Sequence, residues 1–176
     1  MGAAQSPAGS LPGVLHPETL SLVRALTGAG VTCWLIGGQA VELLVPHPVR
    51  DHDDIDFLVR KADGVRAVEV LEELGFTHAH GSLTAGDVFY RRGDLLVDLV
   101  PIRDETDPPR TLGELAGIVW PAGLLAPHMV ERDGVPVPTL TPAMHRAMKA
   151  AVAAFYGAEP RDKDRVDLAA LATLPA

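Results

Sequence analysis

Aspartates gather at the entrance to a strongly apolar segment of the chain. Residues 50–56 read RDHDDID, so four of these seven residues are aspartates, and FLVR follows directly. The segment IDFLVR has the β-branched and aromatic content of a buried strand. Side chains alternate faces along a strand, so Asp54 and Asp56 share one face, with Cα atoms roughly 7 Å apart. A third carboxylate, Asp98, stands in the otherwise apolar segment DLLVDLV.

These three carboxylates would be costly to bury without a partner. A lone carboxylate in an apolar strand costs on the order of several kcal/mol or shifts its pKa until it is neutral, and a neighbouring cation removes that cost. If the strand of Asp98 lies beside the strand of Asp54 and Asp56, the three form a set of oxygen ligands that suits Mg²⁺. A pair of such ions clamps the attacking and leaving oxygens in phosphoryl or nucleotidyl transfer. The sequence therefore predicts a metal site at the end of a rigid strand.

Each part of this pattern also has a plain structural interpretation. Asp51 and Asp53 fit loop or capping positions, and we assign them no chemistry. Asp-x-Asp on a strand is a weak indication by itself, and Asp98 alone could pair with an arginine such as Arg103. The three carboxylates together favour the metal site.

A glycine pair precedes the aspartates. Gly37 and Gly38 follow the apolar segment VTCWLI and come before QAVELLV, which has a short helical pattern. Glycines let a phosphate approach the backbone, and a helix N-terminus offers free N–H groups to an anion. A tight strand-to-helix turn is the alternative. The pattern is neither a Rossmann nor a Walker motif, because it lacks a third spaced glycine and a Gly-Lys-Ser/Thr sequence.

The elements that must position these residues alternate between helix and strand. Apolar periodicity, glycines and prolines predict helices over residues 17–27, 39–45, 62–74, 142–156 and 161–174, and strands over 31–37, 55–60, 76–80, 87–92 and 94–102. The last two strands flank Gly93 and read as a hairpin. Prolines in VPVPTL limit residues 135–140 to an edge strand. We predict an α/β or α+β fold, with a mixed β-sheet flanked by helices and a small helical C-terminal part.

The chain of 176 residues is expected to form one core domain with a small appendage. Residues 1–16 are rich in Gly, Ala, Ser and Pro and are predicted to be a disordered tail. The core is expected over residues 17–140 and the C-terminal helical region over 141–176. No segment has the length and apolarity of a membrane span, and no signal sequence opens the chain, so the cytoplasm is the default location.

Charge and cysteine content narrow the function classes. The formal net charge of −8 disfavours nucleic-acid binding, which requires phosphate neutralisation, and is compatible with metal ions and cationic small molecules. The single cysteine, Cys33, lies in an apolar run and is expected to act as a small buried hydrophobe. We therefore expect a small-molecule partner and no membrane or nucleic acid.

At this point the chain resembles a known superfamily. IGGQAVELL, VRDHDDIDFLV and LLVDLV are similar to nucleotidyltransferases, whose pattern is Gly-Gly, Asp-x-Asp on a strand, and a third carboxylate on a later strand. The Gly-Gly-x-Ala-Val start, an Arg two residues before His, and HDDID resemble small aminoglycoside 2''-nucleotidyltransferases and lincosamide nucleotidyltransferases. RDKDRVDLAAL resembles the C-terminal helix common in that group. One departure is Gln39, where many antibiotic-modifying members have tryptophan.

The resemblance implies a role for each of the chemical groups. Asp54 and Asp56 would bind the metal, and Asp98 would complete the site and act as general base on an acceptor hydroxyl. Gly37 and Gly38 would contact the triphosphate of the nucleotide. The implied cofactors are two Mg²⁺ ions and a nucleoside triphosphate, with ATP expected.

Four further residues are candidates for nucleotide binding by the same resemblance. Arg50 and His52 match family positions near the nucleotide or metals, although His52 could instead be a loop residue that orients Asp54. Lys149 and Lys163 could reach the phosphates from the C-terminal helices, or could be solvated surface lysines.

The leading hypothesis is an adenylyltransferase that modifies a hydroxyl of a small molecule, such as an aminoglycoside- or lincosamide-like antibiotic. A protein-modifying nucleotidyltransferase of a toxin–antitoxin pair and a non-catalytic nucleotide-binding module are the alternatives. A tRNA or poly(A) nucleotidyltransferase is disfavoured because the chain has no basic excess. The sequence leaves open whether two protomers build the acceptor pocket together as a homodimer.

Overall fold

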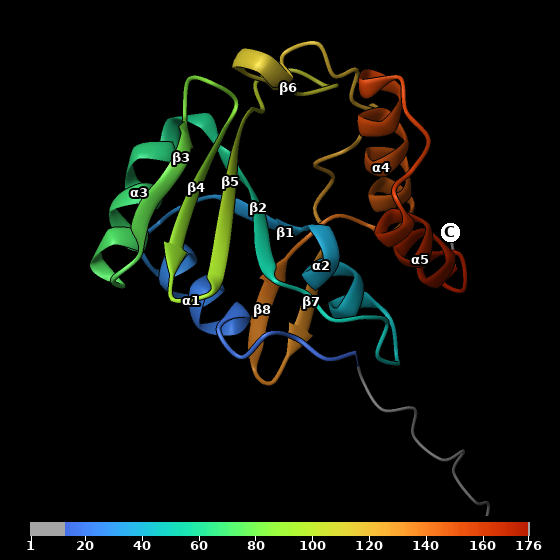
Figure 1. The fold of residues 1–176 in the computed structure, drawn as a ribbon, viewed down its shortest axis with the longest axis horizontal. Coiled ribbons are helices and arrows are strands. Elements are labelled where there is room, and N and C mark those ends of the chain that lie inside the picture. The colour runs from blue at the N-terminus through green and yellow to red at the C-terminus, as the bar shows by residue number, and fades with distance from the viewer. Residues whose placement is uncertain (1–12, 176) are drawn as a thin grey trace, which may run out of the picture.

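The computed structural model describes residues 13–175, which form a mixed β-sheet with helices on both faces (Figure 1). The helices are α1 (Thr19–Gly28), α2 (Gly37–Leu44), α3 (Gly64–Glu73), α4 (Pro142–Tyr156) and α5 (Asp162–Leu171). The strands are β1 (Cys33–Ile36), β2 (Asp54–Arg60), β3 (Thr77–Ser82), β4 (Asp87–Arg92), β5 (Leu95–Arg103), β6 (Arg110–Thr111), β7 (Met129–Arg132) and β8 (Val135–Pro138). This arrangement confirms the predicted fold class.

The main sheet has the strand order β1-β2-β5-β4-β3, and the short β6 pairs with β5. β2 and β5 are parallel, and the remaining pairs are antiparallel. β4 and β5 form the hairpin predicted around Gly93. Parallel neighbours require a crossover, and here it is made by α3, β3 and β4. As a result, two strands far apart in the sequence lie at the centre of the sheet.

Alternation along β2 and β5 sends different side chains to the two faces of the sheet. Ile55, Phe57 and Leu99 are fully buried in the larger hydrophobic cluster, which α1 and α3 cover. The opposite face, which we call the aspartate face, carries Asp56 and Asp98. Its apolar part forms a second cluster with residues of α4 and of the segment 115–125. The sheet is thus fully packed on one side and only partly filled on the other.

The C-terminal helices cover the aspartate face, as Figure 1 shows at the right of the view. Thr141 caps α4, because its Oγ1 accepts a hydrogen bond from Met144 N at 3.2 Å, and Pro142 occupies the first turn. Gly157 ends α4 with φ +59°, a left-handed conformation that glycine adopts without strain. The chain then turns back into α5, which packs on α4 and α2.

Element boundaries differ from the predictions in a few places. The strand expected over 31–37 is shorter, and α2 begins already at Gly37, because the chain turns as soon as it leaves the sheet. β7 was missed; among the described strands it pairs with β8, the proline-containing strand expected at an edge. The final helix ends at Leu171. No helix in residues 13–175 is long and apolar enough to cross a membrane.

The predicted N-terminal tail lies mainly outside the described residues. Residues 13–16 are described, and their backbone is bound to the core. Gly13 N donates to Val45 O at 3.3 Å, and Val14 N donates to the Glu42 carboxylate at 3.0 Å. This end of the tail therefore packs against α2.

Candidate active site

The aspartates meet at the centre of the sheet. β2 and β5 pair in parallel with Asp56 opposite Asp98, and Asp54 lies two residues before Asp56 on the same face. Ile36 is the partner of Asp56 on β1, and Phe89 is the partner of Asp98 on β4. The structure thus brings the three predicted carboxylates to one side of two neighbouring strands.

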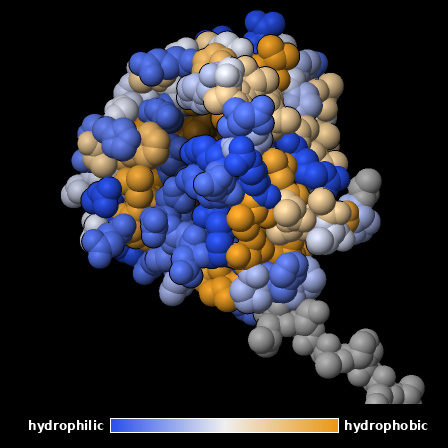
Figure 2. All heavy atoms as spheres, turned by 45° about the vertical axis from the view of Figure 1, so that its right-hand side comes forward, coloured by the Kyte–Doolittle hydropathy of each residue, from blue (hydrophilic) through white to orange (hydrophobic). Residues whose placement is uncertain are grey.

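The three carboxylates line a cavity of about 590 Å³ between the sheet and the C-terminal helices. Gly37, Lys149 and Lys163 line the same cavity. Figure 2, which views the side carrying α4 and α5, shows hydrophilic residues over much of this face and a recess with apolar side chains at its bottom. The volume lies within the range of small-molecule sites.

Burial shifts the acid strength of two carboxylates. Burial, with the nearby carboxylates of Asp56, Asp87 and Asp54, raises the pKa of Asp98 to about 8. Burial and then Asp54 raise the pKa of Asp56 to about 7. Asp98 Oδ1 is buried and has no hydrogen-bond partner among the described residues. The pairing with Arg103 that the sequence left open is not formed there.

The carboxylate oxygens of this site suit a divalent cation that also binds water and substrate oxygens. An unpartnered carboxylate oxygen beside a second buried carboxylate is the environment that a cation stabilises. Within residues 13–175, no three His, Cys, Asp or Glu side chains are grouped closely enough to hold a metal ion by themselves. Mg²⁺ is usually bound by one or two carboxylates together with water and substrate phosphates, so the residues fit an ion of this kind.

The glycine pair brings the start of α2 against the aspartates and the preceding loop. Gly37 has φ +66°, and a Cβ there would collide with Asp56 Oδ2. A Cβ on Gly38 would collide with the His52 ring. Both glycines are therefore required by the close approach of these side chains, and Gly37 also lines the cavity.

The loop before β2 is held by a carboxylate that sequence reasoning missed. Glu42 is fully buried on α2, and its carboxylate accepts hydrogen bonds from the N–H groups of Val14, Val49 and Arg50 at 3.0 Å each. His52 Nε2 lies 3.0 Å from Glu42 Oε1. His52 thus binds Glu42, and the suggestion that it orients Asp54 is not supported by any hydrogen bond among the described residues. Neither His52 nor Arg50 lines the cavity.

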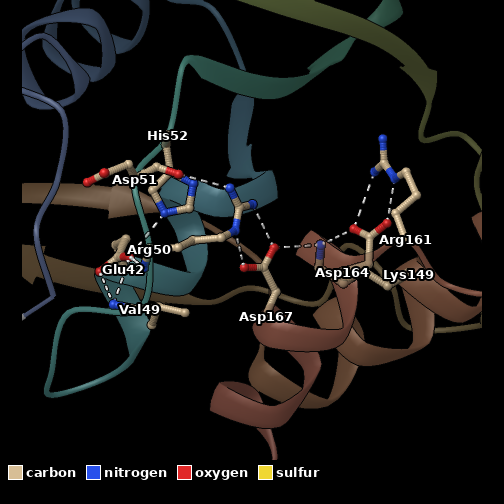
Figure 3. A network of polar contacts seen from close by, with 9 residues as sticks. All are labelled: Glu42, Val49, Arg50, Asp51, His52, Lys149, Arg161, Asp164 and Asp167. Atoms are coloured by element: carbon tan, nitrogen blue, oxygen red, sulfur yellow. Dashed lines mark hydrogen bonds and ion pairs between the residues drawn. The ribbon is translucent and has the colours of Figure 1, made fainter.

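A chain of ion pairs joins this loop to the C-terminal helices (Figure 3). Arg50 forms a two-point contact with the fully buried Asp167, at 2.8 and 3.0 Å. Lys149 Nζ bridges Asp167 and Asp164, at 3.0 and 2.9 Å. Arg161 Nε lies 2.6 Å from Asp164. Desolvation would raise the pKa of Asp164, but the hydrogen bonds from Arg161 and Lys149 outweigh it and lower the pKa to about 2.

Three cations therefore face the aspartates across the cavity. Lys163, Lys149 and Arg161 all line it, and all three lower the pKa of Asp56 against the effect of burial. Lys163 is exposed and forms no ion pair with other described residues. Lys149 is not a solvated surface lysine, because it forms ion pairs with Asp164 and Asp167. Arg161 was missed from the sequence, where nothing distinguishes it from the other charges of RDKDRVD.

The family relationship is decided by a match over most of the chain. Residues 18–171 match the family model described as aminoglycoside-2''-adenylyltransferase. The chain belongs to this family. It is accordingly an enzyme of the nucleotidyltransferase type, as the sequence predicted. A search of curated proteins found no match.

Solved structures agree with the family in fold. A lincosamide antibiotic adenylyltransferase, LnuA, in its lincomycin-bound form, is 15% identical, with 92% of this chain and 99% of that chain covered and a TM-score of 0.68. ANT(2'')-Ia in complex with adenylyl-2''-tobramycin is 18% identical, with coverage of 86% and 84% and a TM-score of 0.62. A nucleotidyltransferase from Thermotoga maritima is 16% identical, with coverage of 82% and 87% and a TM-score of 0.51. At these identities the likeness shows the fold alone.

Gln39, the position at which the sequence departs from the family pattern, lies away from the cavity. This side chain is buried and points to the N-terminal segment, where its Oε1 accepts hydrogen bonds from His16 N at 2.8 Å and from Thr19 Oγ1 at 2.9 Å. It does not line the cavity. The departure from tryptophan at this position therefore does not change the cavity wall directly.

Proposed function

We propose that this protein transfers AMP from ATP to a hydroxyl group of a small cationic acceptor such as an aminoglycoside, with release of pyrophosphate. The observation that carries the proposal is the pairing of Asp56 with Asp98 on adjacent strands, beside Asp54 and the turn at Gly37, all of which line one cavity. In this arrangement the carboxylate oxygens would bind the metal, and the start of α2 would bind the phosphates. The family relationship supports the same reaction class.

The three aspartates would have different roles in the reaction. Asp54 and Asp56 would hold two Mg²⁺ ions, and Asp98 would share one of them and accept the proton of the acceptor hydroxyl. Bound Mg²⁺ supplies charge stabilisation for the attacking and leaving oxygens. The hydroxyl oxygen forms a bond to the α-phosphorus, and the bond from this phosphorus to the bridging oxygen of pyrophosphate breaks. The proton goes to Asp98, and the negative charge leaves with pyrophosphate.

Backbone and basic groups would bind the phosphates. Gly37 lies beside Asp56 at the N-terminus of α2, where free N–H groups can bind an anion. Lys163, Lys149 and Arg161 line the opposite wall and supply positive charge. In-line geometry with electrostatic stabilisation accounts for most catalysis in phosphoryl transfer.

His52 and Arg50 would act at a distance from the nucleotide. Both pack against Gly38, and both are tied to buried carboxylates. We assign them the task of holding the start of α2 and β2 in place, so that the glycines and aspartates keep their spacing.

Asp87 supports a cationic acceptor. It lines the cavity at the start of β4, two residues before Phe89, the partner of Asp98, and its charge contributes to the raised pKa of Asp98. Glu159 adds a carboxylate to the cavity wall. An ammonium group on the acceptor would find favourable electrostatic partners there.

A pyrophosphate-release assay tests the proposal. Purified protein with Mg²⁺ is given each nucleoside triphosphate together with tobramycin, other aminoglycosides or lincomycin, beside the Asp98→Asn variant. Release that requires one acceptor and disappears in Asp98→Asn is the expected result. Binding of ATP without turnover on any acceptor would point to a different acceptor, and no nucleotide binding would contradict the proposal.

A further inference from the structure

A buried carboxylate on α5 joins two walls of the site without lining the cavity (Figure 3). Asp167 is fully buried, and it accepts hydrogen bonds from Arg50 at 2.8 and 3.0 Å and from Lys149 Nζ at 3.0 Å. Arg50 belongs to the loop that leads into β2, and Lys149 belongs to α4. Any effect of Asp167 on a ligand in the cavity therefore passes through the two cations that it holds.

Lys149 is the cation of this pair that lines the cavity. Only 10% of its side chain is exposed, and its ammonium group pairs with Asp164 at 2.9 Å as well as with Asp167. An ammonium group has three hydrogen donors. Among the described residues, Lys149 Nζ makes these two hydrogen bonds, which leaves one donor for a ligand.

The ion pairs fix this ammonium group without cancelling the positive charge of the wall. Three cations and two carboxylates form the chain, which leaves one positive charge in excess: Arg50, Lys149 and Arg161 with Asp164 and Asp167. A freely moving lysine would supply its charge from many rotamers and would lose side-chain entropy when it bound a phosphate. A lysine that is already held loses less.

We propose that Asp167 is a positioning residue for binding of the nucleotide phosphates: it holds the Lys149 ammonium group at one place on the cavity wall, with its third donor available to a phosphate oxygen, and through Arg50 it ties that place to the loop before Asp54; this inference rests on the proposed nucleotide transfer. One carboxylate thereby sets the spacing between the cationic wall on α4 and the metal-binding strand β2.

Charge and position predict opposite effects of removing this carboxylate. Asp167→Asn deletes a negative charge, so the site would bind anions more tightly if charge alone mattered. If position dominates, binding weakens, because Lys149 is then mobile and the ligand itself must order it. We expect the Kd values for ATP and for inorganic tripolyphosphate, both with Mg²⁺, to rise about three- to tenfold in Asp167→Asn.

The small number of lysines makes the state of Lys149 directly measurable. The chain has three lysines, and the other two, Lys61 and Lys163, are exposed. Ammonium protons of exposed lysines exchange with water too fast to give a sharp NMR signal, whereas those of a buried, ion-paired lysine exchange slowly. In protein labelled with ¹⁵N-lysine, we expect one sharp ammonium signal, which Lys149→Met removes and so assigns. Asp167→Asn should lose this signal.

A double-mutant cycle separates positioning from a general loss of structure. Calorimetric titration with ATP or tripolyphosphate in Mg²⁺ compares Asp167→Asn in the wild-type and Lys149→Met backgrounds. If Asp167 acts through Lys149, its replacement weakens binding in the first background and has no further effect in the second. Asp162→Asn is the matched control, because Asp162 lies exposed on the same helix and away from the cavity, and it should match wild type.

The other outcomes are distinct. Tighter or unchanged binding by Asp167→Asn, an equal loss of binding in both backgrounds, or an ammonium signal that survives in Asp167→Asn would each overturn the inference. Thermal melts show whether the variants are folded. If Asp167→Asn does not fold, the wild-type spectrum still decides, because the lack of a slowly exchanging ammonium signal means that Lys149 is not held. If the wild type shows this signal but binds neither ATP nor tripolyphosphate, the proposed function fails, and the inference fails with it.

Discussion

Replacing Asp98 by asparagine should abolish the reaction and, at alkaline pH, stabilise the metal-free protein. Asp98 is buried beside other carboxylates, and its pKa is raised from 3.8 to about 8. In the unfolded chain the group would lose its proton near pH 4. Between these values the folded state holds a proton that the unfolded state does not, so stability is lost as the pH rises through this window.

The magnitude follows from the shift. Each pKa unit corresponds to about 1.4 kcal/mol, so a shift of this size sets an upper limit of roughly 5–6 kcal/mol at pH 8. Water entering the cavity reduces the cost, and we expect about 2–4 kcal/mol. Asparagine has the same shape without the charge. Asp98→Asn should therefore unfold roughly 4–15 °C higher than wild type at pH 8 and within about 1 kcal/mol of it at pH 4.5.

The measurement is thermal or urea unfolding in EDTA at both pH values, with pyrophosphate release measured in parallel. Asp94→Asn is the matched control, because Asp94 is exposed near the β4–β5 turn and its removal should change little. If Asp98→Asn is less stable than wild type at pH 8, or if its stability rises equally at both pH values, the claim that Asp98 is a buried carboxylate without a compensating cation is refuted. Retained activity would refute its role as base.

Three other substitutions test separate parts of the site. Gly37→Ala should lower kcat/KM at least about 100-fold in steady-state kinetics, because the alanine Cβ would displace the Asp56 carboxylate. Near-normal activity would contradict the close approach of Asp56 to Gly37. Arg50→Lys should lower the free energy of unfolding by about 1–3 kcal/mol in urea titrations, since lysine cannot make the two-point contact with Asp167; an unchanged midpoint would mean that this contact does not hold the loop. Lys163→Ala should raise KM for ATP about tenfold with a smaller change in kcat, whereas Lys61→Ala, which removes an exposed lysine elsewhere, should leave KM unchanged.

The local parts of the fold and site could be predicted because they depend on residues near one another in the chain. Alternation along a strand is enough to place Asp54 and Asp56 on one face, and the Thr141-Pro142 pair is enough to start α4. The glycine pair allowed a tight strand-to-helix turn or the approach of a phosphate, and Gly37 has the positive φ of such a turn, with Asp56 close to it. These signals need no knowledge of the partner strand.

Only the tertiary structure decided which residues from distant parts of the chain lie next to one another. The pairing of Asp56 with Asp98 depends on the crossover that makes β5 a parallel neighbour of β2, and strand register is set by the whole sheet and not by either segment. Glu42 looked like an ordinary helix residue, but packing buries it completely beneath the loop that leads to the aspartates. The cavity itself cannot be predicted from the sequence, because it exists only where α4 and the segment 115–125 leave part of the sheet face unfilled.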